Sequence, residues 1–224
     1  MDTIVVSAIT KRFGRRADIP FLARIEEEAS TPPFEQSLWA ELLEPSGTSV
    51  HDFLAAMLTA DASQWGRVED FLLLEVAERP AAACALFRPC QKPGSDGPLD
   101  LSRLPEIASL LSWDDRTLKT FRLAYEKAWG GNLDFLCPQA EMIVETVAVL
   151  PDFRGQGLGH ALMRAAFETA RAKGARSLGI MVIHGNDTAK RLYERYFRPY
   201  ITFHETYFED QFPGLTKFRA DLRQ

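Results

Sequence analysis

Hydrophobic and polar positions in the first half of the chain follow two spacings, one typical of strands and one typical of helices. Residues 3–9 form a short β-rich run. Apolar side chains then recur at near-helical intervals and predict three helices, over residues 17–29, 37–43 and 50–58. Two β-like runs, 71–76 and 81–87, are separated by a short turn that contains a proline, so we expect them to pair antiparallel.

The composition changes in the middle of the chain. Residues 89–98 are rich in Pro, Gly, Ser and Lys, and helical spacing then predicts two helices, over residues 104–111 and 114–129. Two consecutive glycines end the second helix. We interpret residues 89–139 as a helical insertion in a larger domain.

The second half of the chain alternates between strands and helices. Residues 142–150, MIVETVAVL, are apolar on both faces apart from Glu145 and Thr146, as in a central strand that is covered on both sides. Residues 157–173 place apolar side chains at i, i+3, i+4, i+7 and i+8, which predicts an amphipathic helix. The other expected elements are strands over 178–183, 200–207 and 215–222 and a short helix over 187–196.

These elements predict one α/β domain over residues 1–224, with a mixed sheet, flanking helices and the insertion before the central strand. A length of 224 residues is compatible with one large domain. Hydrophobic residues make up 46% and charged residues 25% of the chain, which is typical of a soluble globular protein and excludes disorder, collagen and coiled coil.

Charge and hydropathy exclude several kinds of partner. The net charge is −5 and no run of five like charges is present, so the chain lacks the footprint of general nucleic-acid binding. No apolar run approaches the about 18 residues of a membrane span, and the N-terminal residues lack a secretory pattern. We therefore expect no membrane partner and a cytoplasmic location. Cys84, Cys90 and Cys137 form no C-x-x-C pair, so we expect buried free thiols, no disulfide framework and no metal site.

The sequence RGQGLGH, residues 154–160, joins the apolar strand to the amphipathic helix. Its three glycines remove the Cβ atoms that would hold a ligand away from the backbone. The first turn of a helix has free N–H donors and the positive end of the helix dipole, so a phosphate or pyrophosphate is the expected ligand. Arg154 can add a full positive charge. A tight turn without a ligand is the alternative, and the loop alone does not decide between the two.

Two better-known phosphate loops do not fit this spacing. A P-loop requires a Lys-Ser or Lys-Thr pair after its last glycine, and none follows here. A dinucleotide fingerprint would place its third glycine at position 160, where the chain has His160. The pattern that does fit is R-x-x-G-x-G, filled by Arg154, Gly157 and Gly159.

On these residues the chain resembles the GNAT superfamily of acyl-CoA-dependent N-acetyltransferases, whose pyrophosphate loop reads Q/R-x-x-G-x-G/A. Residues 186–193, NDTAKRLY, match that family's second segment, N-x-x-A-x-x-L-Y, at the expected distance. Two patterns in the right order, with the right flanking elements, make the resemblance specific. It covers the C-terminal half well and residues 1–88 only in outline. The chain departs from many members at Arg195-Tyr196-Phe197, where they have Leu-Gly-Phe, and in the length of its insertion.

The resemblance implies the transfer of an acetyl or longer acyl group from acetyl-CoA to a primary amine of a small molecule or peptide. The pyrophosphate of coenzyme A would lie on Arg154, Gly155, Gln156, Gly157, Leu158, Gly159 and His160. The backbone of Val147 and Val149 would pair with the pantetheine arm, and an N–H of that strand, splayed from its neighbour, would stabilise the oxyanion. Asn186 would contact the cofactor or serve only as a helix N-cap.

The resemblance also implies that Tyr193 protonates the leaving thiolate, and a half-buried core aromatic is the alternative for this residue. Glu145 is a candidate base, because a lone carboxylate in an apolar strand must be paired, hydrated or raised in pKa. Glu141, four residues earlier, would share its strand face if the strand extends that far. For both residues, an ordinary paired carboxylate is the alternative.

Two other functions stay open at this point. A non-catalytic member would bind acyl-CoA as a sensor or scaffold, and a structural or interaction protein would use the glycine loop only as a turn. If the chain is an enzyme, the insertion, with Trp113 and Trp129, is expected to border the acceptor site or a subunit interface. The acidic balance favours a small amine or a basic peptide as acceptor, and a homodimer is the commonest default for assembly.

Overall fold

The computed structural model describes residues 9–89, 97–131 and 134–223. Within them, seven strands form one sheet in the order β1-β2-β3-β4-β5-β7-β6. The strands are β1 (Ile9–Phe13), β2 (Phe71–Val76), β3 (Arg79–Phe87), β4 (Met142–Val149), β5 (Ser177–Ile183), β6 (Arg198–Phe203) and β7 (Leu215–Asp221). Neighbouring strands pair antiparallel except β4 and β5, which run parallel. The predicted mixed sheet and the antiparallel pairing of β2 with β3 are therefore confirmed.

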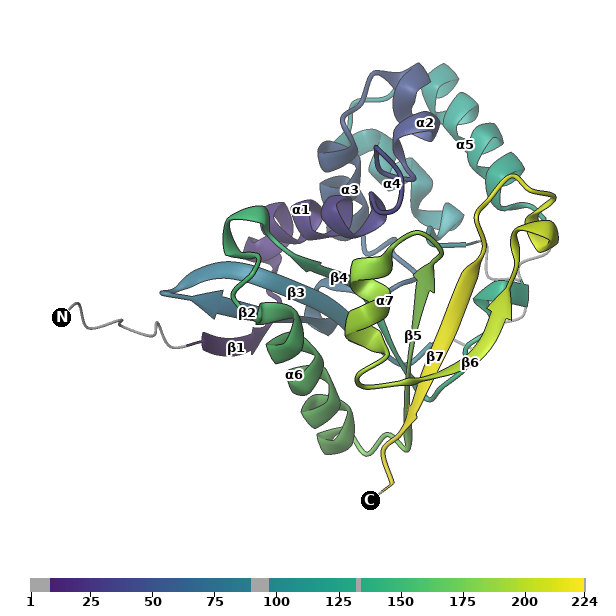
Figure 1. The fold of residues 1–224 in the computed structure, drawn as a ribbon. Coiled ribbons are helices and arrows are strands. Elements are labelled where there is room, and N and C mark those ends of the chain that lie inside the picture. Colours follow the sequence, from purple (N-terminus) through teal and green to yellow (C-terminus); the bar gives the residue numbers. More distant parts are fainter. Residues whose placement is uncertain (1–8, 90–96, 132–133, 224) are drawn as a thin grey trace.

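Helices cover both faces of this sheet (Figure 1). They are α1 (Ile19–Ser30), α2 (Ala40–Leu43), α3 (Val50–Thr59), α4 (Leu104–Leu110), α5 (Asp115–Trp129), α6 (Leu158–Ala172) and α7 (Asp187–Tyr193). In Figure 1, α1 and α3 lie above the sheet and α6 lies below it. Leu22 and Ile25 of α1 and Leu162 and Met163 of α6 are each 0% exposed, so the apolar faces of both helices form the core against the sheet.

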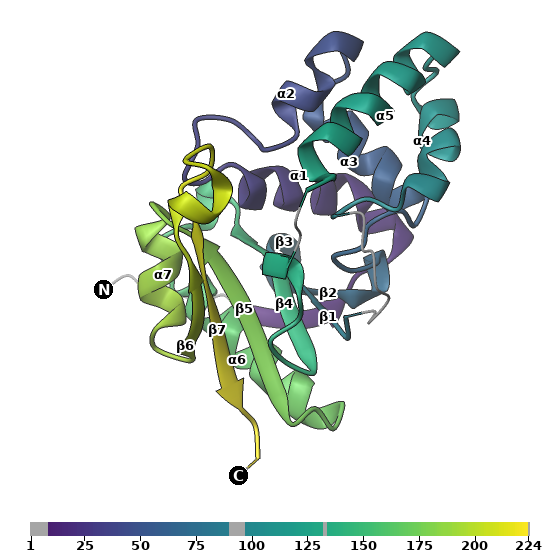
Figure 2. The same ribbon diagram turned by 90° about the vertical axis from the view of Figure 1, so that its right-hand side faces the viewer.

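The insertion extends the layer that contains α1 and α3. Helix α4 packs against α3, and α5 packs against α2 (Figure 2). Aromatic rings join α5 to earlier segments: Tyr125 stacks on Trp39 with ring centroids 6.2 Å apart, and Trp129 meets Trp65 edge-on at 6.0 Å. The Tyr125 hydroxyl also accepts a hydrogen bond from the Leu99 N–H at 2.9 Å. The insertion is therefore joined to the same hydrophobic core as the helices before it.

Most predicted elements are confirmed to within two residues, and four boundaries are wrong. The strand expected over 200–207 ends at Phe203, because its partner there, Leu215, is the first residue of β7. Residues Glu205–Phe208 instead form a 3-10 turn. The first strand continues to Phe13 as an edge strand paired with β2; positions 3–8 of the predicted run lie outside the described residues.

Two predicted helices are shorter than their patterns. Helix α2 begins only at Ala40, because the Ser37 side chain accepts the Trp39 N–H at 3.3 Å and competes with a helical start. Helix α7 ends at Tyr193, whose carbonyl accepts from the N–H groups of both Tyr196 and Phe197 at 2.9 Å. In both cases local hydrogen bonds override the apolar spacing.

The cysteine prediction is partly wrong. Cys84 is a buried free thiol, as expected, but Cys137 is exposed, and Cys90 lies outside the described residues. Among the described residues, no helix combines the length and apolarity needed to cross a membrane.

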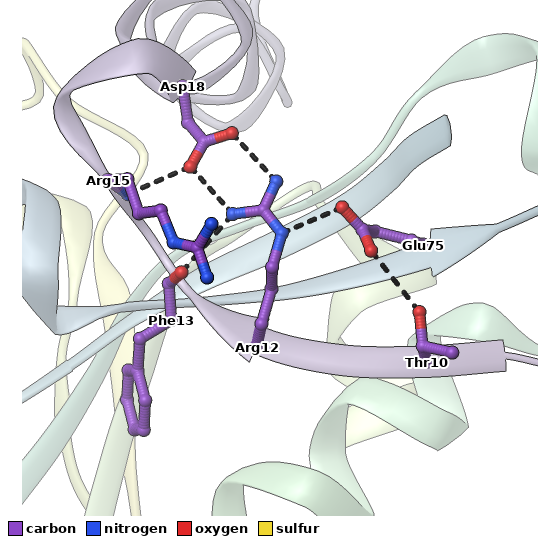
Figure 3. A network of polar contacts seen from close by, with 6 residues as sticks. All are labelled: Thr10, Arg12, Phe13, Arg15, Asp18 and Glu75. Carbon is purple, nitrogen blue, oxygen red and sulfur yellow. Dashed lines mark hydrogen bonds and ion pairs between the residues drawn. The ribbon is translucent and has the colours of Figure 1, made fainter. Parts of the chain in front are cut away.

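One edge of the sheet is held by an ion-pair network that the sequence did not reveal (Figure 3). Arg12 of β1 makes two hydrogen bonds to Asp18, of 2.7 and 2.8 Å, and a third of 2.7 Å to Glu75 of β2. Asp18 also accepts the Arg15 N–H at 2.8 Å, and Glu75 accepts the Thr10 hydroxyl at 3.2 Å. Hydrogen bonding to Arg12 holds the pKa of Asp18 below its ordinary value. The network fixes the start of α1 relative to β1 and β2.

Candidate active site

The two parallel strands at the centre of the sheet separate soon after they meet. The β4–β5 ladder contains only the pairs Met142↔Leu178 and Ile143↔Gly179, although β4 continues to Val149 and β5 to Ile183. On its other side, β4 shifts register against β3 between Ala83 and Ala85. Thr146 has a positive φ of 55°, which is rare for a β-branched residue and marks a bulge. The bulge turns β4 away from β5, so the strands are splayed, as the sequence resemblance implied.

A cavity of about 160 Å³ occupies the gap between the separated strands. Residues 144–147 of β4 and 180–183 of β5 form two of its walls. Helix α1 contributes Glu26 and Glu28, and α7 contributes Ala189 and Tyr193. The cavity is therefore lined by both layers of helices and passes through the plane of the sheet.

The glycine loop lies at the start of α6 and has the backbone of an anion site. Gly155 and Gly157 have φ values of 76° and 77°, and an added Cβ at either would meet no protein atom within 4 Å. Within the described residues, no acceptor is found for the backbone N–H groups of residues 155–160. Gly159 differs, since a Cβ there would lie 3.2 Å from the Leu192 side chain. Gly159 thus allows α6 and α7 to pack closely, while the other two glycines leave the backbone open.

Arg154 is committed to partners inside the chain. Its Nε donates to the Val149 carbonyl at 3.1 Å, and its Nη2 lies 2.6 Å from a Glu28 carboxylate oxygen on α1. The Leu150 N–H donates to Ala81 on β3, so by antiparallel alternation the Val149 carbonyl points away from β3, toward the gap. The guanidinium therefore caps the end of β4 next to the loop, although 58% of the side chain stays exposed.

The other predicted loop residues have local roles. Leu158 is buried, and the His160 ring nitrogen lies 3.0 Å from the Tyr196 hydroxyl. The Gln156 side chain donates to the Asp152 carbonyl at 3.4 Å. These side chains are turned to protein partners, so the loop can offer a ligand chiefly its backbone N–H groups.

Asn186 and Tyr193, at the two ends of α7, both line the cavity. The Asn186 side chain accepts the Ala189 N–H at 3.1 Å, so it is the N-cap of α7. Tyr193 is only 6% exposed, and no hydrogen-bond partner for its hydroxyl is found in the part of the chain that the structure describes. Burial, and then the negative charge of Glu145, raises the pKa of this hydroxyl above its ordinary value. The hydroxyl stays protonated at neutral pH.

The structure separates the two acidic candidates. Glu145 lines the cavity, and no hydrogen-bond or ion-pair partner for it is found among the described residues. Burial raises the pKa of Glu145 to about 8, and the positive charge of Lys217 opposes the shift. Glu141 precedes β4, forms an ion pair with Arg176 and accepts the Arg176 N–H at 2.9 Å, which lowers its pKa. It does not line the cavity.

Two charged residues near the site were missed from the sequence. Glu26 is 7% exposed on the apolar face of α1 between Leu22 and Ala29, and burial raises its pKa to about 8. Lys217 of β7 is 3% exposed and donates to the Cys137 carbonyl at 2.6 Å, and burial lowers its pKa. Glu26 interrupts an apolar helical stripe, as Glu145 interrupts an apolar strand, and that signal could have identified it; Lys217 alternates with apolar residues as Arg219 and Asp221 do, so the sequence carries no such signal for it.

Among the described residues, no cluster of three or more His, Cys, Asp or Glu side chains is arranged to hold a metal ion. The site is built instead from a backbone anion loop, a gap between two strands, and the acidic and phenolic side chains that face the gap.

Comparison with known proteins finds similarity to acetyltransferases. Residues 121–197 match the model of the acetyltransferase (GNAT) family. A Bacillus subtilis protein, provisionally described as a ribosomal protein bS18-alanine N-acetyltransferase, is 38% identical over 53 residues, which cover 24% of this chain. The match spans 35% of that relative's length.

Solved structures show the same fold over nearly the whole chain. An N-acetyltransferase from Staphylococcus aureus Mu50 superposes with a TM-score of 0.58 and 14% identity, covering 94% of this chain and 100% of its own. The structure of yncA from Salmonella typhimurium, which contains acetyl-CoA, gives a TM-score of 0.52 and 14% identity, covering 97% and 95%. At these identities the likeness establishes the fold, and it confirms the predicted GNAT-type architecture.

Proposed function

Because the chain carries a GNAT-family segment within a GNAT fold, we propose that it is an N-acetyltransferase that moves an acetyl group from acetyl-CoA to a primary amine. The observation that carries the proposal is the continuity of the site. The separated strands β4 and β5 enclose one cavity that contains Glu145, Tyr193 and Asn186, and the open N–H groups of the glycine loop begin just beyond β4.

Acetyl-CoA is the co-substrate that this family uses, and the chain offers candidate positions for its pyrophosphate and its pantetheine arm. The pyrophosphate fits the N–H groups of residues 155–160 at the positive end of α6. The pantetheine arm fits along β4, where Val147 lines the gap and the Val149 carbonyl faces it. Binding there competes with the hydrogen bond from Arg154, so we propose that Arg154 turns toward the pyrophosphate when the donor binds.

Glu145 and Tyr193 supply the proton transfers. In the proposal, Glu145 takes the proton of the attacking ammonium, since its raised pKa of about 8 makes it a stronger base than an ordinary carboxylate. Tyr193 then protonates the departing thiolate. Negative charge on Glu145 contributes to the raised pKa of Tyr193, so the phenol becomes a stronger acid once Glu145 is neutralised. In this proposal, proton uptake by Glu145 comes first and assists the later proton donation by Tyr193.

The acceptor is a primary amine of a small molecule or of a peptide. The description of the Bacillus subtilis relative names the alanine of a ribosomal protein as its acceptor, which is one case within this class. Helix α1 lines one side of the cavity, so in this proposal the amine approaches from the helical layer that contains the insertion.

The first test is calorimetric titration with acetyl-CoA, with Gly157→Ala and Gly47→Ala as a matched pair. Both glycines have left-handed φ values, 77° and 65°, and neither has a protein atom within 4 Å of an added Cβ. Each substitution therefore brings a similar backbone strain of about 1–2 kcal/mol. We expect Gly157→Ala alone to weaken acetyl-CoA binding, by about tenfold or more, which is about 1.4 kcal/mol.

The proposal fails if the wild-type protein binds no acetyl-CoA at millimolar concentration. Release of coenzyme A across a panel of amines then separates an enzyme from a non-catalytic acyl-CoA sensor. Binding without turnover on any amine would favour the sensor.

A further inference from the structure

The α1 side of the cavity carries a carboxyl group and aromatic side chains that the transfer of an acetyl group does not by itself require. Its walls on this side include Glu26, Trp39, Met57 and Trp65. These residues come from the helical layer on the face opposite α6 (Figure 1). A donor whose pyrophosphate lies at the start of α6 reaches the gap from the other side, so this wall is left to the acceptor.

Glu26 has no partner that would account for its burial. It is 7% exposed, and no hydrogen bond or ion pair to its carboxyl group is found within the described residues. Its neighbour Glu28 also lines the cavity but is paired with Arg154. Without a partner, the buried carboxyl group is favoured in its protonated form, and a cation bound beside it would restore the ionised form.

A second unpaired carboxyl group faces the same cavity. Glu145, on β4, is also without an ion-pair partner among the described residues. A cation bound in the cavity would supply the positive charge that both carboxyl groups lack among the described residues. The cavity is therefore complementary to one positive charge.

Indole rings complete this wall, and the insertion holds them in place. Trp39 is 7% exposed and stacks on Tyr125, and Trp65 packs against Trp129. An added Cβ at Gly97 would lie 2.8 Å from the Trp129 ring, so the backbone also presses closely on α5 here. Aromatic faces next to a carboxylate are the surroundings in which proteins bind ammonium groups.

We propose that Glu26, in the cavity wall that also contains Trp39 and Trp65, recognises the acceptor as a protonated primary alkylamine and holds it for Glu145. The inference rests on the proposed acetyltransferase function and adds the substrate class. A cavity of about 160 Å³ is close to the about 150 Å³ that accommodates a benzene molecule. It therefore has room for a slim, unbranched ammonium-bearing arm.

The test measures KM and kcat separately for n-butylamine and 1,4-diaminobutane, after calorimetry with acetyl-CoA. Glu26→Gln keeps the size of the side chain and removes its charge, so we expect the amine KM to rise about tenfold or more. The kcat at saturating amine and the acetyl-CoA Kd should stay as in the wild type. Glu26→Asp, which keeps the charge on a shorter side chain, should recover part of the lost affinity for the amine.

Glu27→Gln is the matched control, because Glu27 is the next residue of α1 and does not line the cavity. It should leave the amine KM unchanged. Thermal melts show whether each variant is folded at the assay temperature, and if Glu26→Gln is not, a raised KM in Glu26→Asp is the required result.

An unchanged amine KM in Glu26→Gln would overturn the inference, and so would a lower kcat at unchanged KM. Failure of the wild type to acetylate either alkylamine while it binds acetyl-CoA would also overturn the inference and leave the donor site intact. Failure to bind acetyl-CoA would remove the proposed function itself, and the inference with it.

Discussion

Two groups of carboxylates on the same sheet have opposite surroundings. At the β1–β2 edge, Asp18 and Glu75 share the guanidinium of Arg12, and the side chains of Arg12 and Asp18 are only 25% and 11% exposed. Glu26 of α1 and Glu145 of β4 line one cavity, and no ion-pair partner for either is found among the described residues. The first group has its charges paired and stabilises the fold, while the second is left open for a ligand.

The pKa values show the same contrast. Hydrogen bonding to Arg12 lowers the pKa of Asp18 from 3.8, whereas burial raises the pKa of Glu26 and Glu145 from 4.5 to about 8. A lowered pKa favours the folded state when the group is ionised, and a raised pKa favours it when the group is protonated. The ionised Asp18 therefore stabilises the folded state at neutral pH, whereas Glu26 and Glu145 destabilise it at that pH.

The largest expected effect comes from removing the proposed base. Glu145→Gln should lower kcat by about 10²–10⁴-fold, because it removes the group proposed to take the ammonium proton. In the wild type, kcat/KM should rise with pH through about 8 as Glu145 loses its proton. The variant should lose the rise with pH that the wild type shows in kcat at saturating amine, and keep its acetyl-CoA affinity. A kcat equal to that of the wild type would exclude Glu145 as the base.

The proposed acid should show a smaller effect on the same step. Tyr193→Phe removes only the hydroxyl from a buried ring, so we expect kcat to fall about 10²-fold with little change in stability. Tyr196→Phe is the control, since the Tyr196 hydroxyl contacts His160 beside the loop. If both variants lose activity equally, the role of Tyr193 in proton transfer is contradicted.

Breaking the paired network should instead affect stability. Arg12→Leu leaves Asp18 and Glu75 without their cation, and we expect unfolding free energy to fall by about 2 kcal/mol in urea titrations. Lys11→Leu tests the neighbouring ion pair with Glu168, whose side chains are 50% and 62% exposed. That change should cost under about 1 kcal/mol. Equal losses of unfolding free energy in Arg12→Leu and Lys11→Leu would mean that burial of the Arg12 network adds no stability.

The pH dependence of stability should run in opposite directions in the two groups. Glu26 and Glu145 favour the folded state while protonated, so their contribution should be lost as pH rises from 4.5 to about 8. A Glu26→Gln/Glu145→Gln double variant should therefore gain thermal stability relative to the wild type as pH rises through this window. The contribution of Asp18 is present above pH 3.8 and is lost as pH falls below it. A constant difference in Tm between double variant and wild type across this range would contradict the raised pKa values.

The sequence predicted the place of the insertion only in general terms, and its contacts in the structure make that place specific. Residues 89–139 were expected to border the acceptor site or a subunit interface. The structure packs Tyr125 and Trp129 of α5 behind Trp39 and Trp65, which line the cavity. This arrangement favours the acceptor side, and the kinetics of Glu26 variants test the wall that the insertion supports.

The sequence alone determined the features that depend on neighbouring residues. Apolar spacing and turn residues gave the order of strands and helices, and the spacing of Arg154, Gly157 and Gly159 indicated an anion loop. Glu145 could be singled out because one charge in an apolar strand is a local anomaly. Such signals survive in the sequence because each is set within a few residues along the chain.

Only the tertiary structure decided which distant residues meet. It separated β4 from β5, brought Glu26 of α1 into the cavity with Glu145, and paired Glu141 with Arg176. It also engaged Arg154 with Glu28, which lies 126 positions earlier in the chain. The physical reason is that the charge state and partner of a side chain depend on burial and on contacts across the fold, which spacing along one chain does not encode.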